Sequence, residues 1–191
     1  MGANTRDAEL VREYLESRDL RYFDELVAGY RDRVMRLVLS VLGPELANDA
    51  EDVVQETFLR AHDRLESFRG QSLFGSWLYR VAYNRALDHR RMGVRRDRRV
   101  RDRAVDPTAR SSEIAAPTAR LIDGERDRAL HRALTRVPQP YQTALRAYYW
   151  LELPLAEIAE LLGVAPGTVK SYLHRGRARL SRQLEKEGFV Q

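Results

Sequence analysis

The side chains best suited to chemistry lie between residues 166 and 180, in the segment PGTVKSYLHRGRARL. Apolar or small residues recur there every three or four positions, which marks one face of a helix: Val169, Leu173, Gly176 and Leu180. Hydroxyl, imidazole and cationic groups occupy the other faces: Thr168, Lys170, Ser171, His174, Arg175 and Arg177. Because such groups bind phosphates and base edges, the segment predicts a helix that contacts DNA.

A shorter helix is predicted directly before this one. Leu155, Ile158 and Leu162 recur at helical spacing. Gly163 is expected to end that helix, and Pro166 is expected at the first position of the next. Two helices joined by a short turn form a helix-turn-helix motif, whose second helix enters the major groove of DNA. The alternative is that this basic hairpin is only a solvated surface.

The composition predicts a globular protein without catalytic or metal chemistry. The chain has 191 residues, of which 43% are hydrophobic, enough for two small cores. It contains no cysteine, and its four histidines show no metal-ligand spacing, so no metal and no cofactor are expected. Since no phosphate-binding glycine loop or nucleophile–base pair is present either, an enzyme is the least expected class. The chain shows no long apolar run and no secretion signal, and it is expected to be cytoplasmic.

Positive charge is concentrated in one segment. Residues Arg85 to Arg103 include nine arginines against three aspartates, a local excess larger than the net charge of +5 of the whole chain. This run predicts a basic strip available to a polyanion. Residues 104–120 hold two prolines and show no helical periodicity, as in a flexible linker. We therefore divide the chain into three parts: a domain at 1–92, a basic, flexible linker at 93–120 and a domain at 121–191.

The N-terminal domain is predicted to be helical throughout, because no segment shows the alternating pattern of a strand. Apolar spacings of three and four predict helices at 8–17, 22–42, 48–70 and 73–92. Gly43 with Pro44 is expected to end the second of these, and Gly93 the fourth. Asn48 with Glu51 matches a capping box at the start of the third. The expected fold class is all-α, with two small helical domains joined by a flexible linker.

Two surfaces of this domain are candidates for function. Asp52, Gln55 and Glu56 lie off the apolar stripe of the third helix and form what we call the acidic face, although solvation alone would also account for it. On the fourth helix, aromatic and polar residues are predicted to share the face opposite the core: Tyr79, Arg80, Tyr83, Asn84 and Arg91. Aromatic rings among cations stack unpaired bases and follow a phosphate backbone. Ordinary exposed tyrosines are the rival interpretation.

Two blocks of the sequence carry a family resemblance. The segments DAEDVVQETFLRAHDRLESFRG and GSWLYRVAYNRALDHRR resemble region 2 of the extracytoplasmic-function sigma factors of bacterial RNA polymerase. The segment VPQPYQTALRAYYWLELPLAEIAELLGVAPGTVKSYLHRGRARL resembles their region 4, and the order of the blocks also fits. The resemblance implies a non-catalytic protein that binds core RNA polymerase, directs it to promoters through −35 and −10 elements, and assists promoter melting.

The resemblance also implies roles for residues in region 2. Asp52, Gln55 and Glu56 match the D-x-x-Q-E core that binds the clamp helices of the largest polymerase subunit, which favours a functional acidic face. The pocket for a flipped −10 base is implied around Phe68, Gly70, Gln71 and Ser72. Further contacts to the single-stranded −10 element are implied for Arg80, Tyr83, Asn84 and Arg91. Trp77 also lies where the family places an aromatic, but its periodicity favours the core.

In region 4 the resemblance implies that duplex DNA at the −35 element contacts Thr168, Lys170, Ser171, His174, Arg175 and Arg177. These residues belong to the second helix of the motif, which is expected to enter the major groove. The polymerase flap region and an anti-sigma factor are the further partners that the family implies. Two other functions remain open: a helix-turn-helix transcriptional regulator, and a sigma-like decoy for an anti-sigma factor.

The chain departs from the family pattern in three places. Tyr172 stands where many relatives have arginine, which removes one cation from the motif. Arg85 and Arg90 stand where the family commonly has leucine, so we expect the end of that helix to pack less tightly and to be more available to DNA. We also hypothesise that the Arg85–Arg103 run extends the contact with promoter DNA, with neutralisation of Arg95, Arg96, Arg98 and Arg99 flattening its salt dependence.

Overall fold

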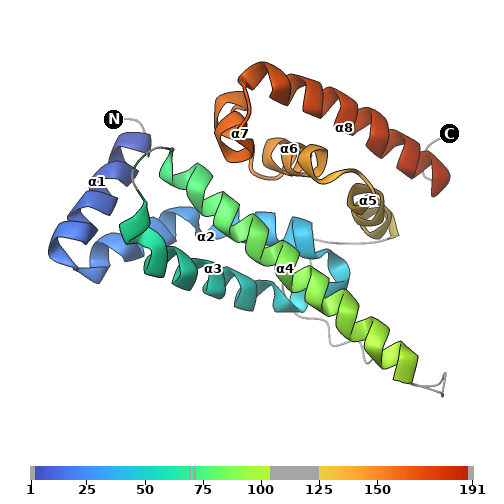
Figure 1. Ribbon diagram of the computed structural model, residues 1–191, viewed down its shortest axis with the longest axis horizontal. Helices are drawn as coiled ribbons and strands as arrows, with labels where there is room; N and C mark the ends of the chain where they lie inside the picture. The colour runs from blue at the N-terminus through green and yellow to red at the C-terminus, as the bar shows by residue number, and fades with distance from the viewer. Residues whose placement is uncertain (1–2, 69, 71, 104–124, 189–191) are drawn as a thin grey trace.

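The computed structural model describes residues 3–68, 70, 72–103 and 125–188 of the chain. Two groups of helices make up the molecule, one from each half of the sequence (Figure 1). No strand occurs in the ranges described, and the all-α expectation is confirmed. Gln71 and the predicted linker residues 104–120 lie outside the described residues, as do the side chains of Arg95, Arg96, Arg98 and Arg99.

The N-terminal group consists of four α-helices and two short 3-10 turns: α1 (Ala3–Ser17), α2 (Leu20–Leu42), η1 (Pro44–Asp49), α3 (Ala50–Arg64), η2 (Leu65–Ser67) and α4 (Phe74–Arg103). Helices α2, α3 and α4 pack against one another, and α1 covers one end of α2. The apolar stripes predicted from spacing face inward, since Val34, Val38, Val53 and Leu78 have no exposed surface. Burial of these side chains stabilises the bundle, at about 25 cal/mol per Å² of apolar surface.

Two helix boundaries in this group show why the sequence prediction succeeded or failed. Helix α2 ends as expected at Gly43, whose φ of 78° suits glycine. The predicted capping box at Asn48 is wrong, because Asn48 lies inside the turn η1 and α3 begins after Asp49. The 3-10 turn η1 begins at Pro44 and includes Asn48. Asn48 therefore lies within a helical turn and does not have the extended backbone of an N-cap residue. The Asp49 carboxylate instead contacts His89 of α4, at 2.8 Å.

Helix α4 is longer than predicted. It continues through Gly93 to Arg103, so the expectation that Gly93 ends it is wrong. A glycine inside a helix costs about 1 kcal/mol but does not break the hydrogen-bond ladder. A side chain at Gly93 would come within 3.1 Å of Leu46, so glycine at this position allows α4 and η1 to approach closely. Residues 93–103, which we assigned to the linker, are therefore helical.

The C-terminal group contains α5 (Glu125–Thr135), α6 (Gln139–Tyr149), α7 (Leu155–Leu162) and α8 (Pro166–Lys186). Helices α7 and α8 form the predicted helix-turn-helix. Gly163 ends α7 in the left-handed conformation, with φ 66° and ψ 38°. Val169, Leu173 and Gly176 are the buried residues of α8, in agreement with the predicted apolar face. Lys170, Ser171 and His174 of α8 are exposed.

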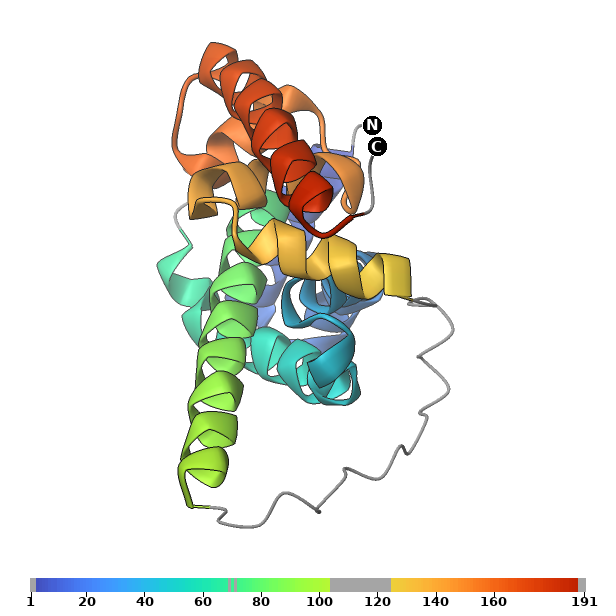
Figure 2. The same ribbon diagram turned by 90° about the vertical axis from the view of Figure 1, so that its right-hand side faces the viewer.

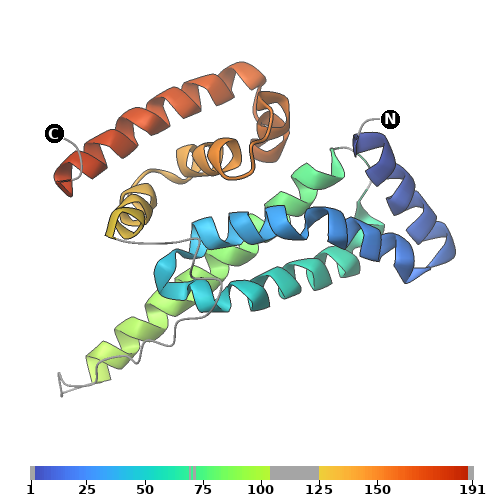
Figure 3. The ribbon, with the colours of Figure 1, turned by 180° about the vertical axis from the view of Figure 1, so that it is seen from behind.

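The two groups pack directly on each other. Helix α7 contacts α4, and α6 contacts α2. The views from the side and from behind also show the C-terminal helices lying along α2 and α4 (Figures 2 and 3). Buried apolar residues of both groups belong to one continuous cluster. The structure therefore describes a closed arrangement, in which each domain covers part of the other.

Candidate protein and nucleic-acid interfaces

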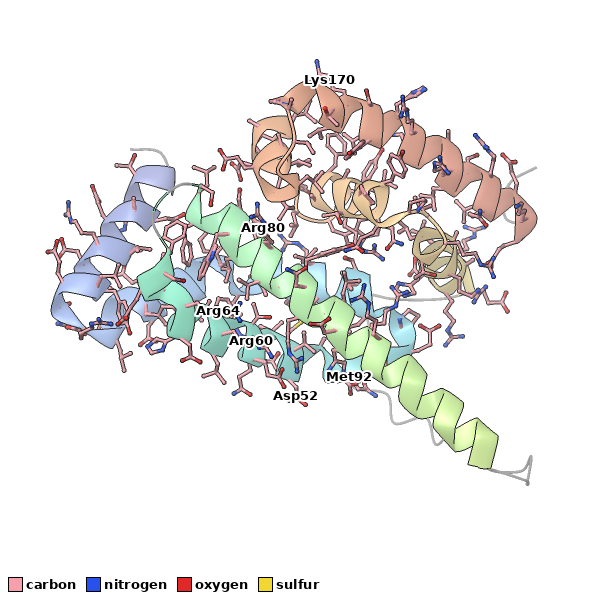
Figure 4. The ribbon with its side chains drawn as sticks, in the orientation of Figure 1. Asp52, Arg60, Arg64, Arg80, Met92 and Lys170 are labelled. Carbon is pink, nitrogen blue, oxygen red and sulfur yellow. The ribbon has the colours of Figure 1, made fainter. Side chains whose placement is uncertain are left out.

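The acidic face lies on α3, on the side of the molecule opposite α8. Asp52 and Gln55 are exposed and Glu56 is half-buried. Figure 4 shows Asp52 at this outer surface, far from Lys170 on α8. The structure thus places these side chains together where a large partner can reach them.

An apolar groove adjoins the acidic face, between α2 and α3. It encloses about 530 Å³, and its lining includes Phe23, Val27, Gln55 and Leu59. Leu59 is 61% exposed and contributes apolar surface to this groove. Sequence reasoning missed this groove. The sequence feature that could have indicated the groove is Leu59, an apolar residue of α3 that lies off the buried stripe.

The two arginines that depart from the family pattern in α4 are held by polar contacts. Arg85 forms an ion pair with the carboxylate of Glu56, and its side chain is only 12% exposed. Arg90 donates from Nη1 to the carbonyl oxygen of Val41, at 3.4 Å, and burial lowers the pKa of its guanidinium. The expectation of loose packing and easy access to DNA is therefore wrong for Arg85. Where the family commonly has leucine, the Arg85 guanidinium contacts the Glu56 carboxylate of the acidic face.

The loop before α4 brings aromatic side chains together. Phe68 packs near Trp77, with ring centroids 5.3 Å apart, and near Phe74, at 5.9 Å. Gly70 is exposed and has a φ of 67°, while Ser72 is half-buried. Trp77 is partly buried and packs against the core, which agrees with its periodicity. The residues around the expected pocket therefore lie at one end of α4, apart from Gln71, which is not described.

The predicted face of α4 divides into exposed and buried parts. Arg80, Asn84 and Arg91 are exposed. Tyr79 and Tyr83 are only 1% and 5% exposed, so the expectation that both tyrosines are solvent-facing is wrong. Their hydroxyls are buried without a hydrogen-bond partner. The cause is tertiary: the ring of Tyr79 packs against Tyr30 of α2, and Tyr83 lies beside Arg146 of α6.

Arg80 is engaged by the other domain. Its Nη2 donates to the backbone carbonyl of Glu160 in α7, at 2.6 Å. The Glu160 carboxylate accepts from the backbone N–H of Leu73, at 3.1 Å. Figure 4 shows Arg80 on the part of α4 nearest α7. A residue predicted to contact DNA is thus bonded within the chain in the closed arrangement.

Helix α8 presents the polar side chains that its periodicity predicted. Lys170, Ser171, His174, Arg175 and Arg177 are exposed, and Thr168 is half-buried near the helix N-terminus. Together these six side chains are called the α8 face below. Figure 4 shows Lys170 on the outer side of the helix, pointing away from α6 and α7. The α8 face is therefore free to approach a polyanion while the domains remain in contact.

Tyrosine side chains make contacts between α6 and α8. Arg177 donates from Nε to the hydroxyl of Tyr149, at 2.9 Å, and lies over the rings of Tyr148 and Tyr149. These two tyrosines are 39% and 52% exposed, and the sequence analysis did not single them out. Tyr172, the departure from arginine in α8, packs edge-on against Tyr141, at 5.3 Å. It is thus a packing residue between α6 and α8.

Charged groups are also buried where the domains meet. Arg146 of α6 has no exposed surface, and its Nε donates to the carbonyl oxygen of Ser40 in α2, at 3.0 Å. Its Nη1 donates to Gln142 Oε1, at 2.8 Å, and its Nη2 has no partner. Burial lowers the pKa of Arg146 to about 10. Sequence periodicity did not indicate this burial, since arginine is rarely buried without a carboxylate.

His131 of α5 lies in the same contact between the domains. Its ring sits over Gly43, where an added Cβ would come within 2.3 Å of Nε2. A pocket of about 210 Å³ adjoins it, lined by residues of both domains, among them Leu39 and Trp150. Burial lowers the pKa of His131 to about 4, and the positive charge of nearby Arg146 acts in the same direction.

In the ranges that the structure covers, no three histidine, aspartate or glutamate side chains form a group that would hold a metal ion. No described helix is long and apolar enough to cross a membrane.

Comparison with known proteins matches both halves of the chain to one family. The family model "Sigma-70 region 2" matches residues 26–96, and "Sigma-70, region 4" matches residues 127–180. The RNA polymerase sigma-H factor of Pseudomonas aeruginosa is 32% identical over 190 residues, covering 94% of each chain. The ECF RNA polymerase sigma factor SigW of Bacillus subtilis is 33% identical over 169 residues, covering 85% of this chain and 88% of that protein.

Solved structures show the same fold. CnrH in complex with the cytosolic domain of CnrY aligns with a TM-score of 0.67 and 24% identity, over 95% of this chain and 98% of that one. RpoE of Bartonella quintana, in complex with the anti-sigma factor NepR, aligns with a TM-score of 0.56 and 23% identity, over 85% of this chain and 96% of that one.

The two helical domains and their matches in order define a sigma factor of RNA polymerase. Within the sigma-70 family, the chain belongs to the extracytoplasmic-function group. We therefore call the N-terminal helices region 2 and the C-terminal helices region 4.

Proposed function

We propose that this protein binds core RNA polymerase through region 2 and places its two domains on the −10 and −35 elements of particular promoters, where it assists melting. The observation that carries the proposal is the separation of two exposed surfaces, the acidic face on α3 and the α8 face on region 4. A protein with both can hold the enzyme and the DNA at once. The chain would supply no catalysis of its own and would act in the cytoplasm, where polymerase and chromosome meet.

The polymerase would dock on the acidic face. Gln55 and Asp52 are exposed there, and Glu56 is oriented by its ion pair with Arg85. The adjacent groove with exposed Leu59 adds apolar surface, which interfaces bury in their centre. A mixed surface of this kind suits a helical partner that carries cations and apolar side chains.

Promoter DNA would meet both domains. The α8 face would enter the major groove at the −35 element, where each good base contact contributes about 1–3 kcal/mol of discrimination. At the −10 element, an unpaired base would be held near Phe68, Gly70, Gln71 and Ser72. Arg80, Asn84 and Arg91 would contact the single strand, and Tyr83 would join them once region 4 has left α4.

We infer that an anti-sigma factor also binds this protein. Region 2 and region 4 share their fold with RpoE, whose structure is a complex with the anti-sigma factor NepR. The apolar groove and the acidic face offer such a partner the same surface that polymerase would use. The two partners would then compete.

Transcription with purified components tests the function. Overproduction of the protein, followed by sequencing of transcript 5′ ends, defines candidate promoters. Run-off transcription on one of them, with core polymerase, should start at the mapped position only when the protein is added. Binding to duplex promoter DNA without initiation would instead indicate a conventional helix-turn-helix regulator.

The docking surface is tested separately. Replacement of Gln55 and Glu56 by alanine should weaken co-purification with core polymerase, because it removes the exposed hydrogen-bonding groups of the acidic face. Asp63→Ala is the matched control, since Asp63 is an exposed carboxylate on the same helix. Equal polymerase binding by the double variant and the control would reject this surface.

A further inference from the structure

Region 4 covers the end of region 2 that is proposed to read the −10 element. Helix α7 contacts α4, and this contact includes the beginning of α4. Glu160 is the residue of α7 that makes the polar bonds there. Its carboxylate and its backbone carbonyl each accept one hydrogen bond from region 2.

These two bonds use the groups that an anionic strand would need. The Leu73 N–H belongs to the N-terminus of α4, where the helix dipole favours negative charge. The Arg80 guanidinium is a cation suited to phosphate and to base edges. The Glu160 carboxylate accepts from the first group and the Glu160 carbonyl oxygen accepts from the second. Helix α7 thus occupies, at this end of α4, the hydrogen-bond donors that a DNA strand would use.

Neighbouring side chains strengthen the same contact. Glu157, one turn before Glu160, is half-buried near Arg33 of α2. Tyr83 of α4 is 5% exposed and lies beside Arg146 of region 4. A DNA strand lying along this face would have to displace α7, because the two would occupy the same surface.

We propose that α7 and the single-stranded −10 element compete for the N-terminal end of α4, with Glu160 holding this end closed in the free protein. The inference rests on the proposed function in taking this end as the −10 reader. Binding to DNA or to polymerase then requires region 4 to lift off, and the apparent affinity falls by the fraction of molecules that are open.

The distance between the domains tests the closure directly. The chain has no cysteine, so Asp63→Cys and Arg182→Cys place one label on each domain at exposed sites. Pulsed dipolar spectroscopy on the full chain should show one narrow distance population, because the closed arrangement fixes the two labels relative to each other. Glu160→Ala, which removes the carboxylate but keeps the backbone carbonyl, should raise the ratio of open to closed molecules about three- to tenfold. Amide exchange of residues 73–77 should rise in the same variant.

Glu185→Ala is the matched control, because Glu185 is an exposed glutamate of α8 that bonds only to Ser181 of the same helix. It should leave both the distances and the exchange unchanged. A wild-type protein that gives only a broad distribution of distances would overturn the proposal. So would a Glu160→Ala variant with the same distances and exchange as the wild type.

Run-off transcription separates this inference from the proposed function. Glu160 is outside the predicted DNA-contacting set, so Glu160→Ala should start transcription at the same position as the wild type. If the wild type initiates but Glu160→Ala does not alter the distances, the closure is refuted and the sigma function stands. In another outcome the distances change in Glu160→Ala, but neither this variant nor the wild type supports initiation. The proposed function, and with it the competition with the −10 strand, is then refuted, while the contact between α7 and α4 is confirmed.

Discussion

Acidification should weaken the contact between the two domains through His131. In the closed arrangement the ring is buried over Gly43, near Arg146 and Arg90, and its pKa is lowered from 6.5 to about 4. Separation of the domains exposes the imidazole and restores its ordinary pKa. Because the closed form binds the proton less tightly, closure is at full strength above pH 6.5 and is lost as the pH falls from 6.5 toward 4.

The size of this effect follows from the shift. Each pKa unit corresponds to about 1.36 kcal/mol, so the full shift is worth about 3 kcal/mol, and a change from pH 7.5 to 5.5 costs closure about 1.4 kcal/mol. The ratio of closed to open molecules should therefore fall about tenfold over that interval. Burial raises the pKa of Asp7 and of Glu157 at the other end of the contact, which favours closure in acid.

The doubly labelled protein gives the assay. Wild type and His131→Gln are compared at pH 7.5, 6.5 and 5.5, because glutamine is polar and does not take up a proton in this range. The wild type should open as the pH falls, and the variant should respond much less. The reasoning is refuted if both proteins show the same pH dependence, or if the His131 resonances of the closed protein titrate at the ordinary 6.5.

Three other changes have defined outcomes. Leu78→Ala removes a fully buried side chain of α4 and should lower the free energy of unfolding in urea by about 3–5 kcal/mol; a loss below about 1 kcal/mol would show that the site collapses around the change. Arg85→Leu removes the ion-pair partner of Glu56 and should weaken core polymerase binding about two- to fivefold, whereas unchanged affinity would mean that Arg85 only packs α4. Lys170→Ala should weaken binding to −35 duplex DNA and lower the salt slope of the affinity by about one unit; an unaltered slope would remove Lys170 from the phosphate contacts.

Most of the helices could be predicted because their apolar residues recur at regular spacing and all point into a core. Val34 and Val38 in α2, or Val169 and Leu173 in α8, are buried as their periodicity requires. Glycine proved a weaker guide. Gly43 and Gly163 end helices because they adopt positive φ, whereas Gly93 keeps the helical conformation and allows close packing.

The errors about which side chains are exposed share one physical cause, which is contact between segments far apart in the chain. Tyr79 and Tyr83 lie off the main stripe of α4, and periodicity alone cannot indicate that Tyr79 packs against Tyr30 of α2 and that Tyr83 lies beside Arg146 of α6. Arg85 was expected to loosen α4 but finds a carboxylate on α3, 29 residues away. The burial of Arg146 likewise depends on the carbonyl oxygen of Ser40, 106 residues away. Local sequence patterns contain no information about such partners.

Arg146 also determines how durable the junction of the domains is. Its guanidinium has exchanged a full shell of water for two neutral oxygens and has one nitrogen without any bond. Separation of the domains would hydrate the guanidinium again. The free energy of this hydration opposes the free energy gained by burying the apolar surfaces around it. The interface therefore fixes how the two domains sit relative to each other, yet hydration of Arg146 favours its opening, and opening does not require either domain to unfold.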